Sequence, residues 1–119
     1  MATIRAAGLA VDCPDPKALA AFYTALLNVE PAGDDAVIIA RGDWGRLEMW
    51  FQPVENYAAP TWPTQERGQQ LHLDFECDDR EAMVARAVEL GAQQVDRQDS
   101  FTVMLDPAGH PFCLCDPYQ

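Results

Sequence analysis

Acidic, aromatic and imidazole side chains recur at every second position in two segments of the sequence. Because strand residues two apart point to the same face, Glu48 and Trp50 would share one face. His72, Asp74 and Glu76 would share another. Carboxylates on a shielded face must be paired, protonated or hydrated, since burying an isolated charge is unfavourable. A cationic or hydrogen-bonding molecule stacked on Trp50 would satisfy them, because aromatic faces attract cations. A water-filled groove with solvated acids is the alternative.

The apolar residues of the same segments alternate with the polar ones and fall on the opposite face. A further segment near the end of the chain alternates in the same way. The apolar sets are Leu47, Met49 and Phe51; Leu73, Phe75 and Cys77; and Phe112 and Leu114, opposite Cys113 and Cys115. This split predicts strands with one face under helices and the other toward a cavity.

The two halves of the chain repeat one plan. Residues 9–19 match residues 73–83, with Cys13 aligned to Cys77 at an offset of 77 − 13 = 64. A second match aligns Glu48 with Cys113 at an offset of 113 − 48 = 65. Repetition of this kind decides the architecture. We expect a pseudo-twofold fold with its site where the halves face each other.

Each half is expected to contain a strand, a helix and three strands, in that order. The predicted first-half elements are a strand over 3–13, a helix over 16–27, and strands over 29–33, 36–41 and 46–53. Those of the second half are a strand over 70–77, a helix over 80–90, and strands over 93–96, 101–105 and 111–116. Asp15 and Asp79 are suited to cap the helices, Pro16 to start the first and Gly91 to end the second. Turns are expected at 33–35, 42–43 and 106–110.

Residues 54–68 contain prolines and aromatic residues in place of a strand pattern. Proline removes donors from a strand ladder, so this segment is predicted to be a linker or an ordered lid. Tyr57 and Trp62 could close over a ligand from there. The predicted organisation is one domain over 1–119, with module 1 at about 1–53, the linker at 54–68 and module 2 at about 69–119.

Composition restricts the partners of the chain. At 119 residues it is expected to form one domain, and its formal charge of 8 − 19 = −11 disfavours nucleic acid and anionic membranes. There is no apolar run of about 18 residues to span a membrane and no secretory pattern at the start. We therefore expect a cytoplasmic protein with its four cysteines reduced.

Several motifs of the chain resemble those of the vicinal oxygen chelate superfamily, which includes glyoxalase I, bleomycin-resistance proteins and extradiol dioxygenases. They are Val11–Pro16, Ala21–Tyr23, His72–Asp79 and Asp106–His110. The resemblance covers nearly the whole chain and is nearest to the short, glyoxalase-like bacterial branch. It implies an α+β fold in which two βαβββ modules form a curved mixed sheet around a cavity. It also implies a homodimer.

The resemblance further implies where a metal ion would bind. Metal-binding members take one ligand from the first strand and one from the last strand of each module, here Gly8, Glu48, His72 and Cys113. Gly8 has no side chain to offer, and Cys113 stands where glutamate is usual. A zinc, nickel, manganese or iron ion on His72, Glu48 and Cys113 would support lyase or isomerase chemistry of the glyoxalase type. The incomplete set favours a protein without a cofactor.

The preferred interpretation is metal-independent binding of a small aromatic or cationic molecule between the modules, as in sequestration by resistance proteins. The candidate ligand-binding residues are Trp50, Glu48, His72, Asp74, Glu76, Cys113 and Trp62. The rival interpretation is the metal-dependent lyase or isomerase, and a third is an accessory module. A Cys113 nucleophile activated by His72 is less favoured, because no oxyanion hole is evident.

Overall fold

The computed structural model describes residues 2–3, 7–33, 38–41 and 48–117. Leu47 and the turn expected at 42–43 lie outside the described residues, as does most of the turn at 33–35. The chain divides into two compact units, Met1–Tyr57 and Ala58–Gln119. The following description takes each unit by itself.

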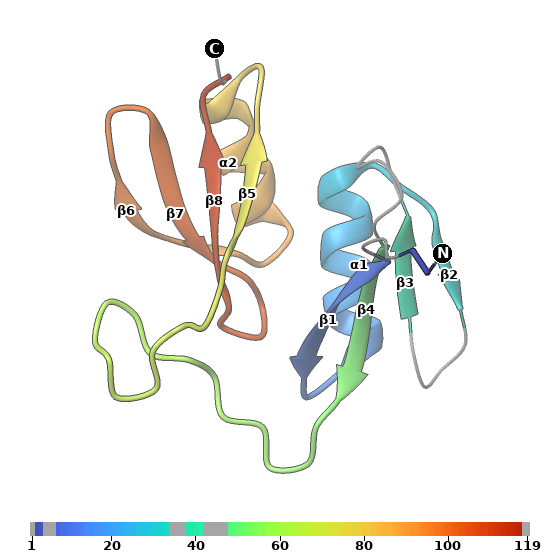
Figure 1. Cartoon of the computed structure of the whole chain (residues 1–119). Coiled ribbons are helices and arrows are strands. Elements are labelled where there is room, and N and C mark those ends of the chain that lie inside the picture. The colour runs from blue at the N-terminus through green and yellow to red at the C-terminus, as the bar shows by residue number, and fades with distance from the viewer. Residues whose placement is uncertain (1, 4–6, 34–37, 42–47, 118–119) are drawn as a thin grey trace. The chain divides into compact units, whose positions relative to one another are not determined.

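The two units repeat one order of elements (Figure 1). The first contains β1 (Gly8–Cys13), α1 (Pro16–Leu27), β2 (Pro31–Gly33), β3 (Ile38–Arg41) and β4 (Glu48–Pro53). The second contains β5 (Leu73–Glu76), α2 (Arg80–Glu89), β6 (Gln93–Arg97), β7 (Phe101–Leu105) and β8 (Pro111–Cys115). The sheets have the orders β1-β4-β3-β2 and β5-β8-β7-β6, each with one parallel pair and two antiparallel pairs. The predicted α+β class with a repeated βαβββ plan is confirmed.

Both helices begin at the predicted residues; α1 also ends as predicted, and α2 ends at Glu89, one residue before the predicted end. The Asp15 side chain accepts a hydrogen bond from the Ala18 amide (3.3 Å), and the Asp79 side chain accepts one from Ala82 (3.1 Å). Such caps satisfy amides that have no partner within the helix. Gly91 follows α2 with φ +113°, a conformation that favours glycine. In the described part of the chain, neither helix is long and apolar enough to cross a membrane.

The first strand of the second unit is shorter than its predicted range of 70–77. The strand β5 begins at Leu73, which pairs with Phe112, and β8 begins one residue earlier, at Pro111. The segment 70–72 therefore has little of β8 to pair with. His72 lies immediately before β5, and not within a strand as expected.

The apolar strand faces lie under the helices, as the alternation predicts. In the first unit, Met49 and Phe51 are fully buried, and the Phe51 ring stacks on Tyr23 of α1 with centroids 5.7 Å apart. In the second, Phe112 and Leu114 are buried, and the rings of Phe75 and Phe112 meet edge to face at 6.0 Å. These cores leave the opposite face of each sheet for other contacts.

One arginine connects α2 with the ends of the strands around it. The Arg80 side chain is only 9% exposed and forms an ion pair with Asp116 (Nε to Oδ1, 3.0 Å). Its guanidinium also donates to the carbonyls of Gln98 (2.8 Å) and Asp99 (2.7 Å) and to the Thr102 hydroxyl (3.2 Å). The planar donor set of arginine suits this many acceptors. The network fixes the end of β8 against the β6–β7 turn.

Candidate functional site

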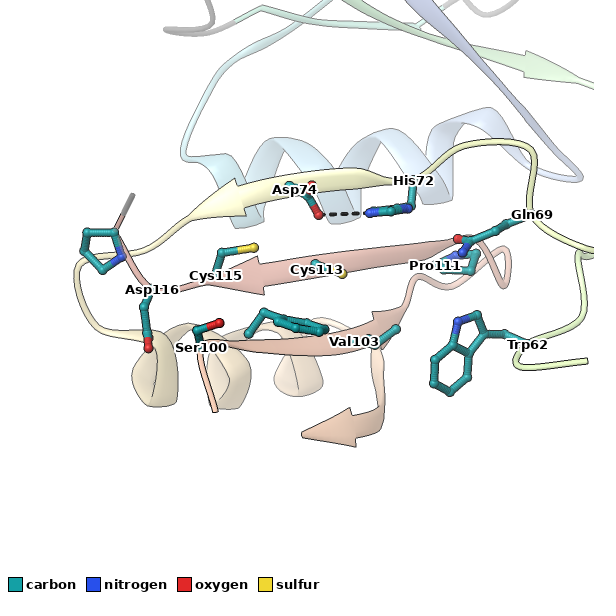
Figure 2. A pocket seen from close by; sticks show the side chains of 12 residues that line it. Trp62, Gln69, His72, Asp74, Ser100, Val103, Pro111, Cys113, Cys115 and Asp116 are labelled. Carbon is teal, nitrogen blue, oxygen red and sulfur yellow. Dashed lines mark ion pairs between the residues drawn. The ribbon is translucent and has the colours of Figure 1, made fainter. Parts of the chain in front are cut away.

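A pocket of about 680 Å³ lies on the face of the second sheet that carries the alternate, non-core residues (Figure 2). Every lining residue belongs to the second unit. They are Trp62, Gln69, His72, Asp74, Ser100, Phe101, Val103, Pro111, Cys113, Cys115, Asp116 and Pro117. The apolar walls with a few polar groups are typical of small-molecule sites.

Strand register determines which side chains meet in this pocket. Asp74 of β5 pairs with Cys113 of β8, and Cys113 pairs with Val103 of β7. Cys115 pairs with Phe101 in the next row on the same face. The floor of the pocket is therefore built on regular backbone, which holds the side chains in place.

An ordered loop supplies one end of the pocket. The Thr61 amide donates to the Arg67 carbonyl (2.8 Å), and the Arg67 amide donates to the Thr61 hydroxyl (3.0 Å). Trp62, between them in the sequence, packs against Val103 and the two pocket cysteines. Figure 2 shows Trp62 and Gln69 at the Pro111 end of β8. The predicted role of Trp62 as part of an ordered segment fits this arrangement, whereas closure by Tyr57, in the first unit, stays a prediction.

Three side chains form what we call the polar corner: His72, Asp74 and Cys113. The His72 Nε2 atom lies 3.1 Å from Asp74 Oδ1 (Figure 2, dashed line). One donor atom from each of the three residues lies within 4.8 Å of the others. The side chains of His72 and Asp74 are 41% and 45% exposed, whereas Cys113 is buried. The polar corner therefore has a buried thiol at its base, and its imidazole and carboxylate are accessible from the pocket.

The thiol of Cys113 is kept neutral by its surroundings. Its pKa is raised from 9.0 to about 12, first by burial and then by the charge of Asp74 and a hydrogen bond to that carboxylate. Only the thiolate is a strong nucleophile. The arrangement therefore argues against the hypothesis of a Cys113 nucleophile activated by His72.

Gln69 brings a second acceptor to the pocket. Its Oε1 atom is buried and has no hydrogen-bond partner among the described residues. A buried acceptor without a partner is unfavourable. A ligand with an N–H or O–H group would satisfy it.

In the first unit, the indole of Trp50 lies beside Gly8 and Glu48. Trp50 Nε1 donates to Glu48 Oε2 (3.3 Å). A Cβ atom on Gly8 would lie only 2.8 Å from Trp50 Cζ2 and 2.8 Å from the Glu48 carbonyl oxygen. Glycine is required here, because any side chain would collide with the ring and the neighbouring backbone.

The strand registers correct the predicted equivalence of Glu48 and Cys113. Ala10 pairs with Trp50 in the first unit, and Asp74 pairs with Cys113 in the second. Ala10 and Asp74 are equivalent, since 74 − 10 = 64, so Trp50 is equivalent to Cys113, with an offset of 113 − 50 = 63. The predicted offset of 65 for the last strands is wrong by two residues.

The structure brings four of the predicted ligand-binding residues together, namely Trp62, His72, Asp74 and Cys113. Glu76 is exposed and is not among the residues that line the pocket. Glu48 and Trp50 contact each other in the first unit, and their participation in the same site stays a prediction.

Several pocket residues were not predicted. Phe101 and Val103 escaped notice because β7, Phe-Thr-Val-Met-Leu, has apolar residues on both faces, which leaves little contrast for alternation to reveal. Gln69 and Ser100 lie outside the strands, where no periodic signal exists.

The residues present do not fit the four-position metal set of the superfamily. Trp50 occupies the space that a ligand at position 8 would need, and it holds the carboxylate of Glu48. The donors that do converge are those of the polar corner, a nitrogen, an oxygen and a sulfur atom. Asp74 was predicted to bind a ligand but not a metal ion, although its position two residues after His72 on one face was visible in the sequence.

Comparisons with known proteins agree with the fold. A model of the glyoxalase-like domain matches residues 8–115. No curated protein matches the sequence significantly. A glyoxalase/bleomycin resistance protein/dioxygenase family enzyme from Burkholderia phytofirmans has a similar structure, with a TM-score of 0.74 and 17% identity over 92% of this chain and 96% of that one.

Two further solved structures are similar at the same low identity. A glyoxalase-related enzyme from Fulvimarina pelagi has a TM-score of 0.74 and 16% identity, over 97% of this chain and 89% of that one. TnmS3, an antibiotic-binding protein from Streptomyces, has a TM-score of 0.65 and 17% identity, over 99% of both chains. The chain therefore belongs to the glyoxalase-like domain family of the vicinal oxygen chelate superfamily, and it has the glyoxalase/bleomycin-resistance fold.

Proposed function

We propose that this protein binds a small organic molecule with an aromatic body and a cationic or hydrogen-bond-donating group. The ligand would occupy the pocket of the second unit and contact its side chains directly, without the four-ligand metal of the superfamily. The single observation that carries this proposal is the pocket itself, with apolar walls, the half-exposed carboxylate of Asp74 and one buried acceptor, Gln69 Oε1, that has no partner among the described residues.

The walls of the pocket support the aromatic part of the proposal. Trp62, Phe101, Val103 and Pro111 offer apolar surface around a volume of about 680 Å³. Volumes of roughly 300–1,000 Å³ accommodate drug-sized ligands. An aromatic ring would find flat partners in Trp62 and Phe101.

The polar groups of the pocket support the cationic part. Among the described residues, Asp74 pairs with His72 and Cys113, and Gln69 Oε1 has no partner. Asp116 is the other acid of the lining, and Arg80 already neutralises it. None of the lining residues is lysine or arginine. A ligand cation would therefore lie near Asp74.

One similar protein supports the sequestration role. TnmS3 is an antibiotic-binding protein, and it has the fold of this chain. Capture of an aromatic amine by such a fold needs no reaction. We therefore propose binding, and not turnover, as the function, and a homodimer as its form.

The test is calorimetric titration of the full chain, in the presence of a chelator, with a matched panel of polycyclic aromatic compounds. Each ring system is tested as the aminomethyl, hydroxymethyl and carboxylate derivative. We expect the ammonium compound to bind most tightly. Asp74→Asn should weaken it roughly fivefold, because a half-exposed ion pair contributes about 1 kcal/mol.

Two variants complete the design. Trp62→Ala should weaken the ammonium and alcohol compounds alike, because it removes a shared wall. Glu76→Gln, which removes an exposed carboxylate from the same strand outside the pocket, should change neither. The absence of saturable heat for the whole panel would overturn the proposal.

A further inference from the structure

We propose that the polar corner is also a binding site for a thiophilic divalent cation, Zn²⁺, built from the second unit alone. The site differs from the metal set of the superfamily because Asp74, and not a residue of the first unit, is the oxygen ligand. This inference goes beyond the proposed function and does not rest on it, since the ion needs no organic ligand.

The geometry of the three donors is close to that of a tetrahedral zinc site. His72 Nε2 and Asp74 Oδ1 are 3.1 Å apart, and all three donor atoms lie within 4.8 Å of one another. Ligands at zinc distances of 2.0–2.3 Å around a tetrahedral ion lie about 3.3–3.8 Å apart. Small side-chain rotations would bring nitrogen, oxygen and sulfur to these distances.

The backbone explains why the donors converge. Asp74 lies on β5, His72 lies two residues before it, and Cys113 is the register partner of Asp74 on β8. Two ligands come from one strand segment and the third from its hydrogen-bonded neighbour. Such a site is preorganised, because the sheet fixes the spacing of its ligands.

The surroundings favour a cation and leave room for a fourth ligand. The pocket lining contains no lysine or arginine, and the whole chain has a formal charge of −11. The side chains of His72 and Asp74 are 41% and 45% exposed, so an ion can reach them from the pocket. Water or a ligand heteroatom could complete the shell from the same side.

Binding exchanges one ion for one proton. The Cys113 thiol loses its proton to solvent as the zinc–sulfur bond forms. A neutral His72 presents the lone pair of Nε2, and its ring proton moves to Nδ1. The hydrogen bonds that His72 and Cys113 make to Asp74 are replaced by bonds to the ion.

The test is titration of the reduced, metal-free full chain with Co²⁺ and then Zn²⁺, with no organic ligand present. We expect one equivalent of Co²⁺ to produce a near-ultraviolet thiolate-to-cobalt absorption band that Zn²⁺ abolishes. Asp74→Asn, His72→Ala and Cys113→Ser should each weaken binding by at least about 10- to 100-fold, since even outer-shell partners of metal ligands contribute that much.

Three matched variants serve as controls. Glu76→Gln removes another carboxylate of β5, Cys115→Ser removes the other pocket thiol, and Glu48→Gln removes the carboxylate of the superfamily position. All three should keep the affinity of the unmodified chain. Circular dichroism establishes that each variant is folded.

Proton release provides a measurement that needs no variant. Zn²⁺ added to the unmodified chain in weakly buffered solution should release about one proton per ion, as thiol ligation requires. The absence of the cobalt band or of proton release would overturn the proposal. So would a loss of affinity in Glu48→Gln as large as that in Asp74→Asn. The titration with aromatic compounds is done in the presence of a chelator and does not depend on these results. Each of the two proposals can therefore be refuted without the other.

Discussion

The two units place a large and a small side chain at equivalent positions, but in the opposite order. In the first unit, Gly8 lies under the ring of Trp50, whereas in the second the equivalent residues are His72 and Cys113. In the first unit the larger residue of the pair is Trp50, on the last strand β4. In the second unit it is His72, just before the first strand β5. The indole of Trp50 occupies the space beside Gly8, whereas the smaller thiol of Cys113 lines a pocket. These two positions are therefore the place to test how side-chain volume affects the pocket.

The first prediction concerns the anchoring of α2 by Arg80, whose equivalent position in the first unit is Pro16 (80 − 64 = 16). We expect Arg80→Ala to lower the free energy of unfolding by about 3 kcal/mol, because it leaves the carbonyls of Gln98 and Asp99 and the Thr102 hydroxyl without their donor. Arg80→Lys should recover only part of this loss, since lysine lacks the planar donor set. Chemical denaturation of both variants provides the measurement. Equal stability of Arg80→Ala and the unmodified chain would contradict it.

The second prediction concerns variants that give the first unit the residues of the second unit at positions 8 and 50. Gly8→His should lower the free energy of unfolding by about 2 kcal/mol, because its Cβ would lie 2.8 Å from the Trp50 ring. The double variant Gly8→His/Trp50→Cys, which copies the second unit, should lose less stability than the sum of the single changes. A double-mutant cycle in denaturant measures this coupling. Strict additivity would show that the two residues do not share the space.

The third prediction closes the pocket of the second unit. Cys113→Trp should lower affinity for the ammonium compounds at least about tenfold, which is a loss of about 1.4 kcal/mol. The indole would occupy the pocket as Trp50 occupies its own face. Calorimetry with the same panel checks the result, and Cys113→Ala, which keeps the space open, is the control. Full affinity in the tryptophan variant would place the ligand elsewhere.

The last and smallest effect concerns pH. Burial and then Asp74 raise the pKa of Cys113 from 9.0 to about 12, so this thiol ionises at lower pH in the unfolded chain than in the folded one. The stability that this difference contributes is present below pH 9 and declines as the pH rises toward 12. Mass spectrometry after iodoacetamide treatment at pH 9 should show Cys113 protected in the folded chain. Asp74→Asn should speed its modification, and equal rates in both chains would argue against the role of Asp74.

Sequence patterns predicted the elements and the faces but not the register. Asp15 and Asp79 mark the helix starts because their caps are local, and Met49 and Phe51 mark the core because burial follows a period of two. A slip of one residue would reverse the faces of a strand, but a slip of two preserves them. Alternation therefore could not distinguish Glu48 from Trp50 as the equivalent of Cys113. For the same reason the pairing of Asp74 with Cys113 emerged only from the structure.

The ion pair of Arg80 with Asp116 makes the two ends of the pocket electrostatically different. Asp116 and Ser100 lie at one end, where the carboxylate is already neutralised (Figure 2). Trp62 and Gln69 lie at the other end, near Pro111. We therefore expect the cationic group of an elongated ligand to bind near Asp74 and not near Asp116. Derivatives extended at the end remote from the cationic group should then bind more tightly than derivatives with a bulkier cationic group.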